Sequence, residues 1–190
     1  MKEKNLILFF YVVGGISFGL SMPVLNEQIV LAFGSKGLAI ERLTDLISIM
    51  IFCTAYKYAK TRELIKRYFL KVYLVAIIMT IAVVVMIIRE FNPLLFLICH
   101  LVSYCMLIQY VNRAIVWIRA WFFADPAKRE DYDNSKNLWS SVGGLLGFGV
   151  SSFLVVPLDM ALILYIISMF VLLGWIIVYI KHRSEAPSES

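Results

Sequence analysis

A succession of long apolar runs, with little polar sequence between them, is the feature that most constrains this chain. Hydrophobic residues make up 61% of its 190 residues and charged residues only 16%, whereas soluble domains are about 45–50% apolar and about 25% charged. A bilayer is the solvent that such runs require, and one spanning helix takes about 20 apolar residues. We therefore predict an all-α membrane protein, a six-transmembrane-helix bundle without a soluble domain.

The predicted spans cover nearly the whole chain. In chain order we place them at about 5–25, 38–56, 68–88, 94–123, 138–157 and 159–180. The first run continues toward Met22 without a small-residue cleavage site, so we interpret it as a retained span and not as a secretory signal. The spans form one domain, residues 1–183, and the polar tail 184–190 is expected to be disordered.

The longest polar stretch, 125–137, lies between the fourth and fifth predicted spans. Its mixed charges favour a cytoplasmic loop. Asp133, Asn134 and Ser135 have the short polar side chains that cap helix N-termini. We therefore expect the fifth helix to begin after these residues.

Basic residues are distributed very unevenly between the two sides of the predicted bundle. Fifteen of them fall on one side, namely Lys2, Lys4, Lys57, Lys60, Arg62, Lys66, Arg67, Lys71, Arg113, Arg119, Lys128, Arg129, Lys136, Lys181 and Arg183. Only Lys36, Arg42 and Arg89 fall on the other. Because Lys and Arg concentrate on the cytoplasmic side, both termini are predicted to be cytoplasmic, in a protein integral to a cell membrane. Attraction to anionic membrane lipid then accounts for the net charge of +5 without a nucleic-acid partner.

Catalytic and metal-binding patterns are absent from the sequence. Cys53, Cys99 and Cys105 lie within apolar runs and have no disulfide or metal-ligand spacing. The two histidines are too few for a histidine metal cluster, and no zinc-protease, nucleophile-elbow or nucleotide-phosphate motif is present. We predict neither an enzyme nor a cofactor or metal. A membrane enzyme that uses the acidic cluster around Asp131 and Asp133 stays open as an alternative to the two functions given below.

Polar residues open the second predicted span, where charges are costly and are therefore candidates for function. Arg42 and Asp45 are three residues apart, so they can share a helix face and pair. Together with Glu41 they form either an ordinary interfacial ion pair or a gate. Asp45 is the deepest carboxylate and the best candidate for proton or cation coupling.

The fourth predicted span supplies the other candidate binding residues. Those expected to line a substrate site with Asp45 are His100, Gln109, Asn112 and Arg113. His100 can titrate near neutral pH, or can simply bond a neighbouring helix. Arg113 lies about ten residues, or roughly 15 Å, from Phe123 at the inner end of the span. It can line a cavity, pair with a carboxylate, or extend to the interface.

The fifth predicted span is rich in small residues, among them Gly143, Gly144 and Gly147. Gly143 and Gly147 form a GxxxG motif, which lets helix backbones approach closely in a membrane. Helix packing is the expected role of these glycines.

The stretch 110–156 resembles the connection between the fourth and fifth helices of the major facilitator superfamily. The positions that carry the resemblance are Ala124, Asp125, Pro126, Arg129, Gly143 and Gly147. Between the second and third spans the basic character survives at Lys60, but Ala59 stands where the family has an aspartate. The resemblance implies one half of a major facilitator fold, in which two six-helix halves enclose a cavity with alternating access.

Two functions fit these observations. The first is a half-size secondary transporter that works as a homodimer and moves a small solute. The second is a non-transporting accessory or scaffold subunit that binds a membrane-protein partner through its glycine-rich faces.

Overall fold

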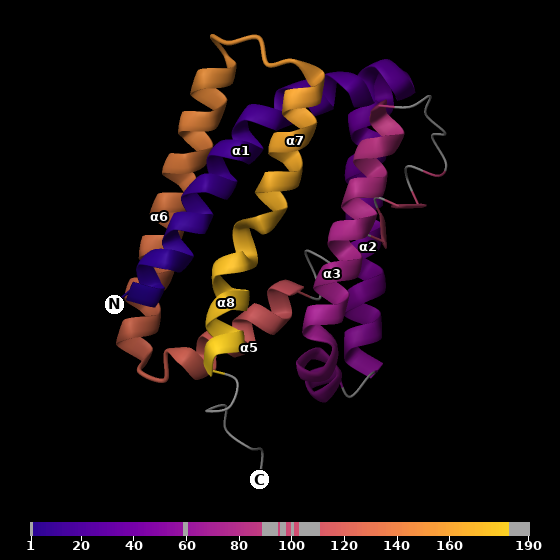
Figure 1. Ribbon diagram of the computed structural model, residues 1–190. Coiled ribbons are helices and arrows are strands. Elements are labelled where there is room, and N and C mark those ends of the chain that lie inside the picture. Colours follow the sequence, from indigo (N-terminus) through magenta and orange to yellow (C-terminus); the bar gives the residue numbers. More distant parts are fainter. Residues whose placement is uncertain are drawn as a thin grey trace. The chain divides into compact units, whose positions relative to one another are not determined.

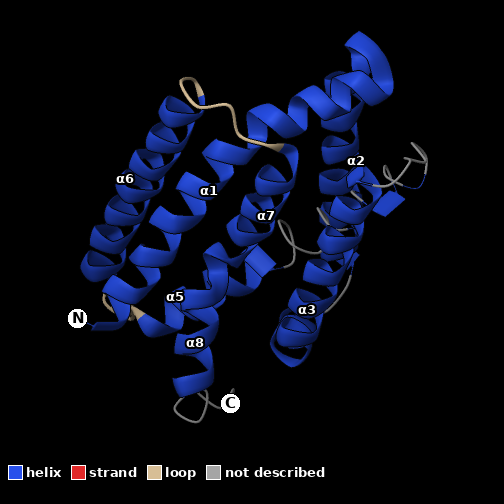
Figure 2. Ribbon diagram, turned by 45° about the horizontal axis from the view of Figure 1, so that its top comes forward, coloured by secondary structure: helices blue, strands red, loops and turns tan. Residues whose placement is uncertain are grey.

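The computed structural model describes residues 2–58, 61–88, 95, 98–99, 101–102 and 111–182. Every regular element in these ranges is a helix, as Figures 1 and 2 show. In chain order the elements are α1 (Lys2–Phe33), the 3-10 helix η1 (Gly34–Lys36), α2 (Gly37–Tyr58), α3 (Thr61–Ile88), α5 (Asn112–Phe122), α6 (Pro126–Ser151), α7 (Leu158–Met169), the 3-10 helix η3 (Phe170–Leu172) and α8 (Leu173–His182). The predicted all-α class is confirmed for the described residues.

Two described helical stretches are long and apolar enough to cross a membrane, Glu3–Leu31 and Leu158–His182. A third, Leu70–Val85, is apolar but shorter. Only fragments of the predicted fourth span before α5 are described, and Ala59, Lys60 and the tail 184–190 lie outside the described residues. The six-span arrangement therefore stays a prediction.

The helices group into two compact units, and α1 contributes to both. Unit 1 combines Met1–Pro23 with Ile115–Ser190, whereas unit 2 is Val24–Ala114. The division falls at Pro23, inside α1. Proline has no N–H for the helical hydrogen bond, so this is also where the helix ladder of α1 is interrupted.

Glycines on α1 and α6 bring these two helices of unit 1 into backbone contact. A Cβ on Gly19 would lie 2.7 Å from the carbonyl oxygen of Gly144, and one on Gly143 would lie 2.7 Å from that of Val12. Gly147 leaves even less room, against the carbonyl oxygen of Ile16. The two helices lie side by side in Figures 1 and 2. Backbone-to-backbone approach of this kind depends on having no Cβ at the contact.

Unit 2 has an apolar cluster of its own among the described residues. Ile29, Val83 and Cys99 are buried in it, with Phe33, Leu38 and Met79 packed around them. Gly34 turns the chain between α1 and α2 with a φ of 73°, a conformation that is strained for residues with a Cβ.

The expected loop at 125–137 is wrong, because these residues form the first half of α6. Asp125 is the N-cap, and its Oδ1 accepts a hydrogen bond from the Ala127 N–H at 3.0 Å. Pro126 then occupies the first helical position, where its missing N–H costs nothing. Asp133, Asn134 and Ser135 lie inside the helix and do not cap it.

The helices at the last two predicted spans, 138–157 and 159–180, have other bounds than predicted. α6 ends at Ser151, and residues 152–157 form a non-helical connection to α7. α7, η3 and α8 then run through 158–182 as one helical stretch with a 3-10 segment at Phe170–Leu172.

Candidate functional site

A row of buried polar side chains follows one face of α2 in unit 2. Thr44, Asp45 and Ser48 form this polar row, and Asp45 is only 7% exposed. Ser48 lies four residues after Thr44 and three after Asp45, and these spacings put the three side chains on one helix face. Other faces of α2 are apolar and exposed at Leu43, Leu46, Ile47, Met50 and Ile51.

Arg42 and Asp45 form an ion pair with very unequal surroundings. Arg42 Nη1 donates to Asp45 Oδ2 at 3.3 Å. The arginine side chain is 61% exposed, whereas the carboxylate is buried. One turn further along, Ser48 Oγ donates to the carbonyl oxygen of Leu101 at 3.0 Å. Buried polar side chains of this kind are candidates for a functional site.

The remaining predicted site residues are only partly placed. Glu41 belongs to α2, and Asn112 and Arg113 open α5, but their side chains are outside the described structure. His100 and Gln109 lie outside the described residues altogether. Among the predicted site residues, the structure brings together Arg42 and Asp45.

A second polar group, in unit 1, was missed from the sequence. Trp175 Nε1 of α8 donates to the hydroxyl oxygen of Tyr132 of α6 at 3.1 Å, and both residues have no exposed surface. Phe123 stacks on Tyr132 with 5.0 Å between ring centroids. Burial raises the pKa of the Tyr132 hydroxyl, and the neighbouring Tyr11 raises it further. Tyr132 is therefore a neutral hydrogen-bonding group.

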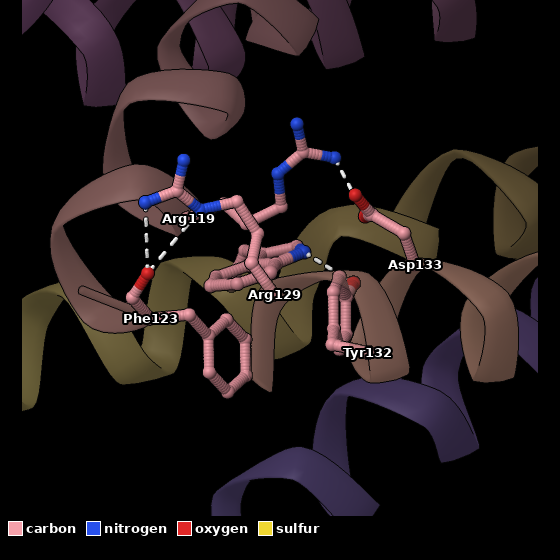
Figure 3. Close-up of polar contacts among 6 residues, drawn as sticks. Arg119, Phe123, Arg129, Tyr132 and Asp133 are labelled. Carbon is pink, nitrogen blue, oxygen red and sulfur yellow. Dashed lines mark hydrogen bonds and ion pairs between the residues drawn. The ribbon is translucent and has the colours of Figure 1, made fainter. Parts of the chain in front are cut away.

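Two arginines hold α5 against the start of α6, as Figure 3 shows. Arg119 Nη1 donates to Asp133 Oδ1 at 2.7 Å. Arg129 donates from Nε and Nη2 to the carbonyl oxygen of Phe123, at 3.2 and 3.0 Å. The second contact satisfies a carbonyl just beyond the end of α5, where no helical donor is available.

The start of α1 is tied to the same end of unit 1. Glu3 Oε1 accepts from Lys181 Nζ at 2.7 Å and lies 3.1 Å from His182 Nε2. Lys4 pairs with Asp131 of α6. We name these ion pairs, together with Arg119–Asp133, Arg129 and the Tyr132–Trp175 bond, the latch. Its charged side chains pair with one another or, at Arg129, with a backbone carbonyl, as in a structural connection between helices.

The start of α6, from which several latch residues come, has a signal in the sequence. Asp125-Pro126 has the pattern of an N-cap followed by a first-turn proline. The pairing of Tyr132 with Trp175 spans 43 residues and had none.

Metal binding finds no support among the described residues, where no group of three His, Cys, Asp or Glu side chains is close enough to hold an ion. Gly143 and Gly147 contact α1, whereas a Cβ on Gly144 would have no atom within 4 Å.

No protein-family model, curated protein or solved structure matches this chain.

Proposed function

We propose that this chain is a multi-pass membrane protein that crosses the bilayer six times, with both termini in the cytoplasm. The 15-to-3 distribution of Lys and Arg supports this orientation. The two helical stretches Glu3–Leu31 and Leu158–His182 have the length and composition of spans. Apolar side chains on the exposed faces of α2 and α3, such as Met50 and Leu74, are those that lipid would cover.

Within that membrane, the proposed function is that of a half-size secondary transporter acting as a homodimer. The resemblance to the amino-terminal half of the major facilitator superfamily supports it, since that architecture needs a second half to close a cavity. Two copies with both ends in the cytoplasm are parallel, as the halves of that fold are. A small solute is the proposed cargo.

The observation that carries this proposal is the buried carboxylate of Asp45. A charge within a membrane span costs several kcal/mol unless it is compensated, so it is retained where it has a use. Asp45 lies eight residues after Gly37, about 12 Å along α2 by helical rise. Its cationic partner Arg42 is exposed and can leave when a proton or cation replaces it.

The accessory-subunit alternative proposes that a partner binds through the glycine-rich faces. Gly143 and Gly147 are occupied by α1 of the same chain, whereas a Cβ on Gly144 or Gly149 would meet no atom within 4 Å. The contact with α1 leaves this alternative a smaller free surface, and Ala59, at the position of the family's aspartate, supports it over the transporter.

Gradient-driven uptake by purified protein in liposomes, over a panel of small solutes, tests the proposal. Asp45→Asn should abolish flux of the transported solute. Asp159→Asn is the matched control, because Asp159 is an exposed carboxylate in the first turn of α7, and it should transport as wild type does. Mass measurement in nanodiscs should give two copies. A stable monomer without flux of any solute would contradict the proposal.

A further inference from the structure

The connection 152–157 between α6 and α7 carries the two most exposed large apolar side chains in the described structure. Phe153 is 90% exposed and Val155 is 97% exposed. No charged residue occurs between Lys136 and Asp159, so the connection continues the neutral apolar surface of α6. Figure 1 shows it at the end of unit 1 opposite the N-terminus. Side chains so exposed in water would have no compensating contact.

The length of α6 sets where this connection begins in a membrane. The uncharged helical part of α6, 137–151, has 15 residues and is about 22 Å long by helical rise. The hydrocarbon core of a bilayer is about 30 Å thick. If the charged half of α6 stays outside the membrane, the helix therefore ends about 8 Å short of the far surface, a depth that the six residues of the connection are long enough to cover.

Backbone hydrogen bonding sets how deep the connection can lie. The N–H groups of Phe153 and Leu154 both donate to the carbonyl oxygen of Val150 at 3.0 Å. The hydroxyls of Ser151 and Ser152 donate to the carbonyl oxygen of Phe148 at 2.8 and 2.9 Å. Non-helical backbone exposed to lipid is excluded from the hydrocarbon core, because its remaining polar groups would go unpaired. At the headgroup boundary, water reaches the backbone while apolar side chains reach the acyl chains.

We propose that residues 152–157 form an interfacial anchor, in which Phe153 and Val155 insert into the lipid at the headgroup–acyl boundary of the outer leaflet. This inference rests on the proposed membrane topology. The ligand is the lipid surface itself. Because the anchor has no charge, insertion depends on apolar contact and not on the headgroup charge or on salt.

Spin labels at Phe153→Cys and Val155→Cys test the anchor, in a full-length background with Cys53→Ala, Cys99→Ala and Cys105→Ala. The labelled protein is reconstituted into phosphatidylcholine vesicles, with and without phosphatidylglycerol. Both labels should have an oxygen-to-nickel collision ratio several-fold above that of a label at Asp159→Cys, which reports water. Both should lie shallower than a label at Leu145→Cys, on the exposed face of α6. Phosphatidylglycerol should leave these values unchanged.

Labels at 153 and 155 that collide with nickel as freely as the one at 159 would overturn the anchor. So would labels shielded from both reagents, because protein and not lipid would then cover the loop. If the label at 145 is exposed to lipid in these experiments, only the anchor is contradicted and the spanning topology is still supported. If the label at 145 is exposed to water, the spanning topology itself is contradicted.

A variant without the apolar side chains provides a second measurement with the native cysteines present. Phe153→Ser combined with Val155→Ser should be cut by elastase within this loop several-fold faster than wild type, in vesicles that present the loop outward. Equal cleavage rates would overturn the anchor.

Discussion

Units 1 and 2 bury their polar side chains in different ways. In unit 1 two pairs of buried or half-buried polar groups connect helices: Tyr132 of α6 with Trp175 of α8, and Arg119 of α5 with Asp133 of α6. In unit 2 the polar row belongs to α2, and the Arg42–Asp45 ion pair stays within that helix, although Ser48 also donates to the carbonyl oxygen of Leu101. Contacts between helices fix an arrangement, whereas a pair within one helix can open without separating helices. The difference assigns stability to unit 1 and the proposed site to unit 2.

The largest effect is expected at the glycine contact of unit 1. Gly147→Ala places a methyl group against the backbone of Ile16 and Gly19, and overpacking of this kind typically costs about 1–3 kcal/mol. Gly144→Ala is the matched control, since its Cβ would meet no neighbour, and replacing glycine in a helix then stabilises by about 0.5–1 kcal/mol. Unfolding in detergent measures both, and equal effects would contradict the described contact.

A loss of at most similar size is expected when the latch loses its buried hydroxyl. Tyr132→Phe removes the acceptor of the Trp175 indole N–H, which has no access to water. Removing one partner of a buried hydrogen bond costs about 1–3 kcal/mol. A double-mutant cycle with Trp175→Phe should give a coupling energy of about 1 kcal/mol. A coupling energy of zero would mean that the bond does not connect α6 with α8.

The exposed part of the latch should matter less. Lys4 pairs with Asp131, whose side chain is 70% exposed. Surface ion pairs contribute about 0–1 kcal/mol, so Lys4→Ala should lower the unfolding midpoint only slightly, and the difference should vanish in high salt. A loss as large as that of Tyr132→Phe would show that unit 1 depends on charges and not on its buried contacts.

The smallest change in stability is expected at the proposed site. Asp45→Asn removes a buried charge and leaves Arg42, whose side chain is exposed, so the free energy of unfolding should change by no more than about 0–1 kcal/mol, the contribution of an exposed ion pair. Arg42→Gln should cost more, because it leaves the buried carboxylate without this cation. If Asp45→Asn destabilises the protein as much as Gly147→Ala does, the polar row is structural and the comparison between the units fails.

Local sequence patterns predicted some elements and misled at others. The apolar runs predicted helices at α1, α2, α3 and α7, because a helix satisfies its backbone within the segment. The three-residue spacing of Arg42 and Asp45 predicted their pair for the same local reason. The polarity of the stretch 125–137 predicted a loop, but residues 126–137 are helical. One face of this helix, at Tyr132, is buried in unit 1, and this burial stabilises the helix although its other faces are charged.

The sequence by itself determined the helical class of the described residues and the pairing of Arg42 with Asp45. These depend on neighbouring residues and on backbone conformation. Only the tertiary structure decided that Gly143 and Gly147 contact α1 while Gly144 itself has room for a Cβ, and that Tyr132 bonds Trp175 from 43 residues away. Such choices depend on which face each helix presents to a distant partner. The energy of that packing belongs to both helices and is not contained in either sequence segment alone.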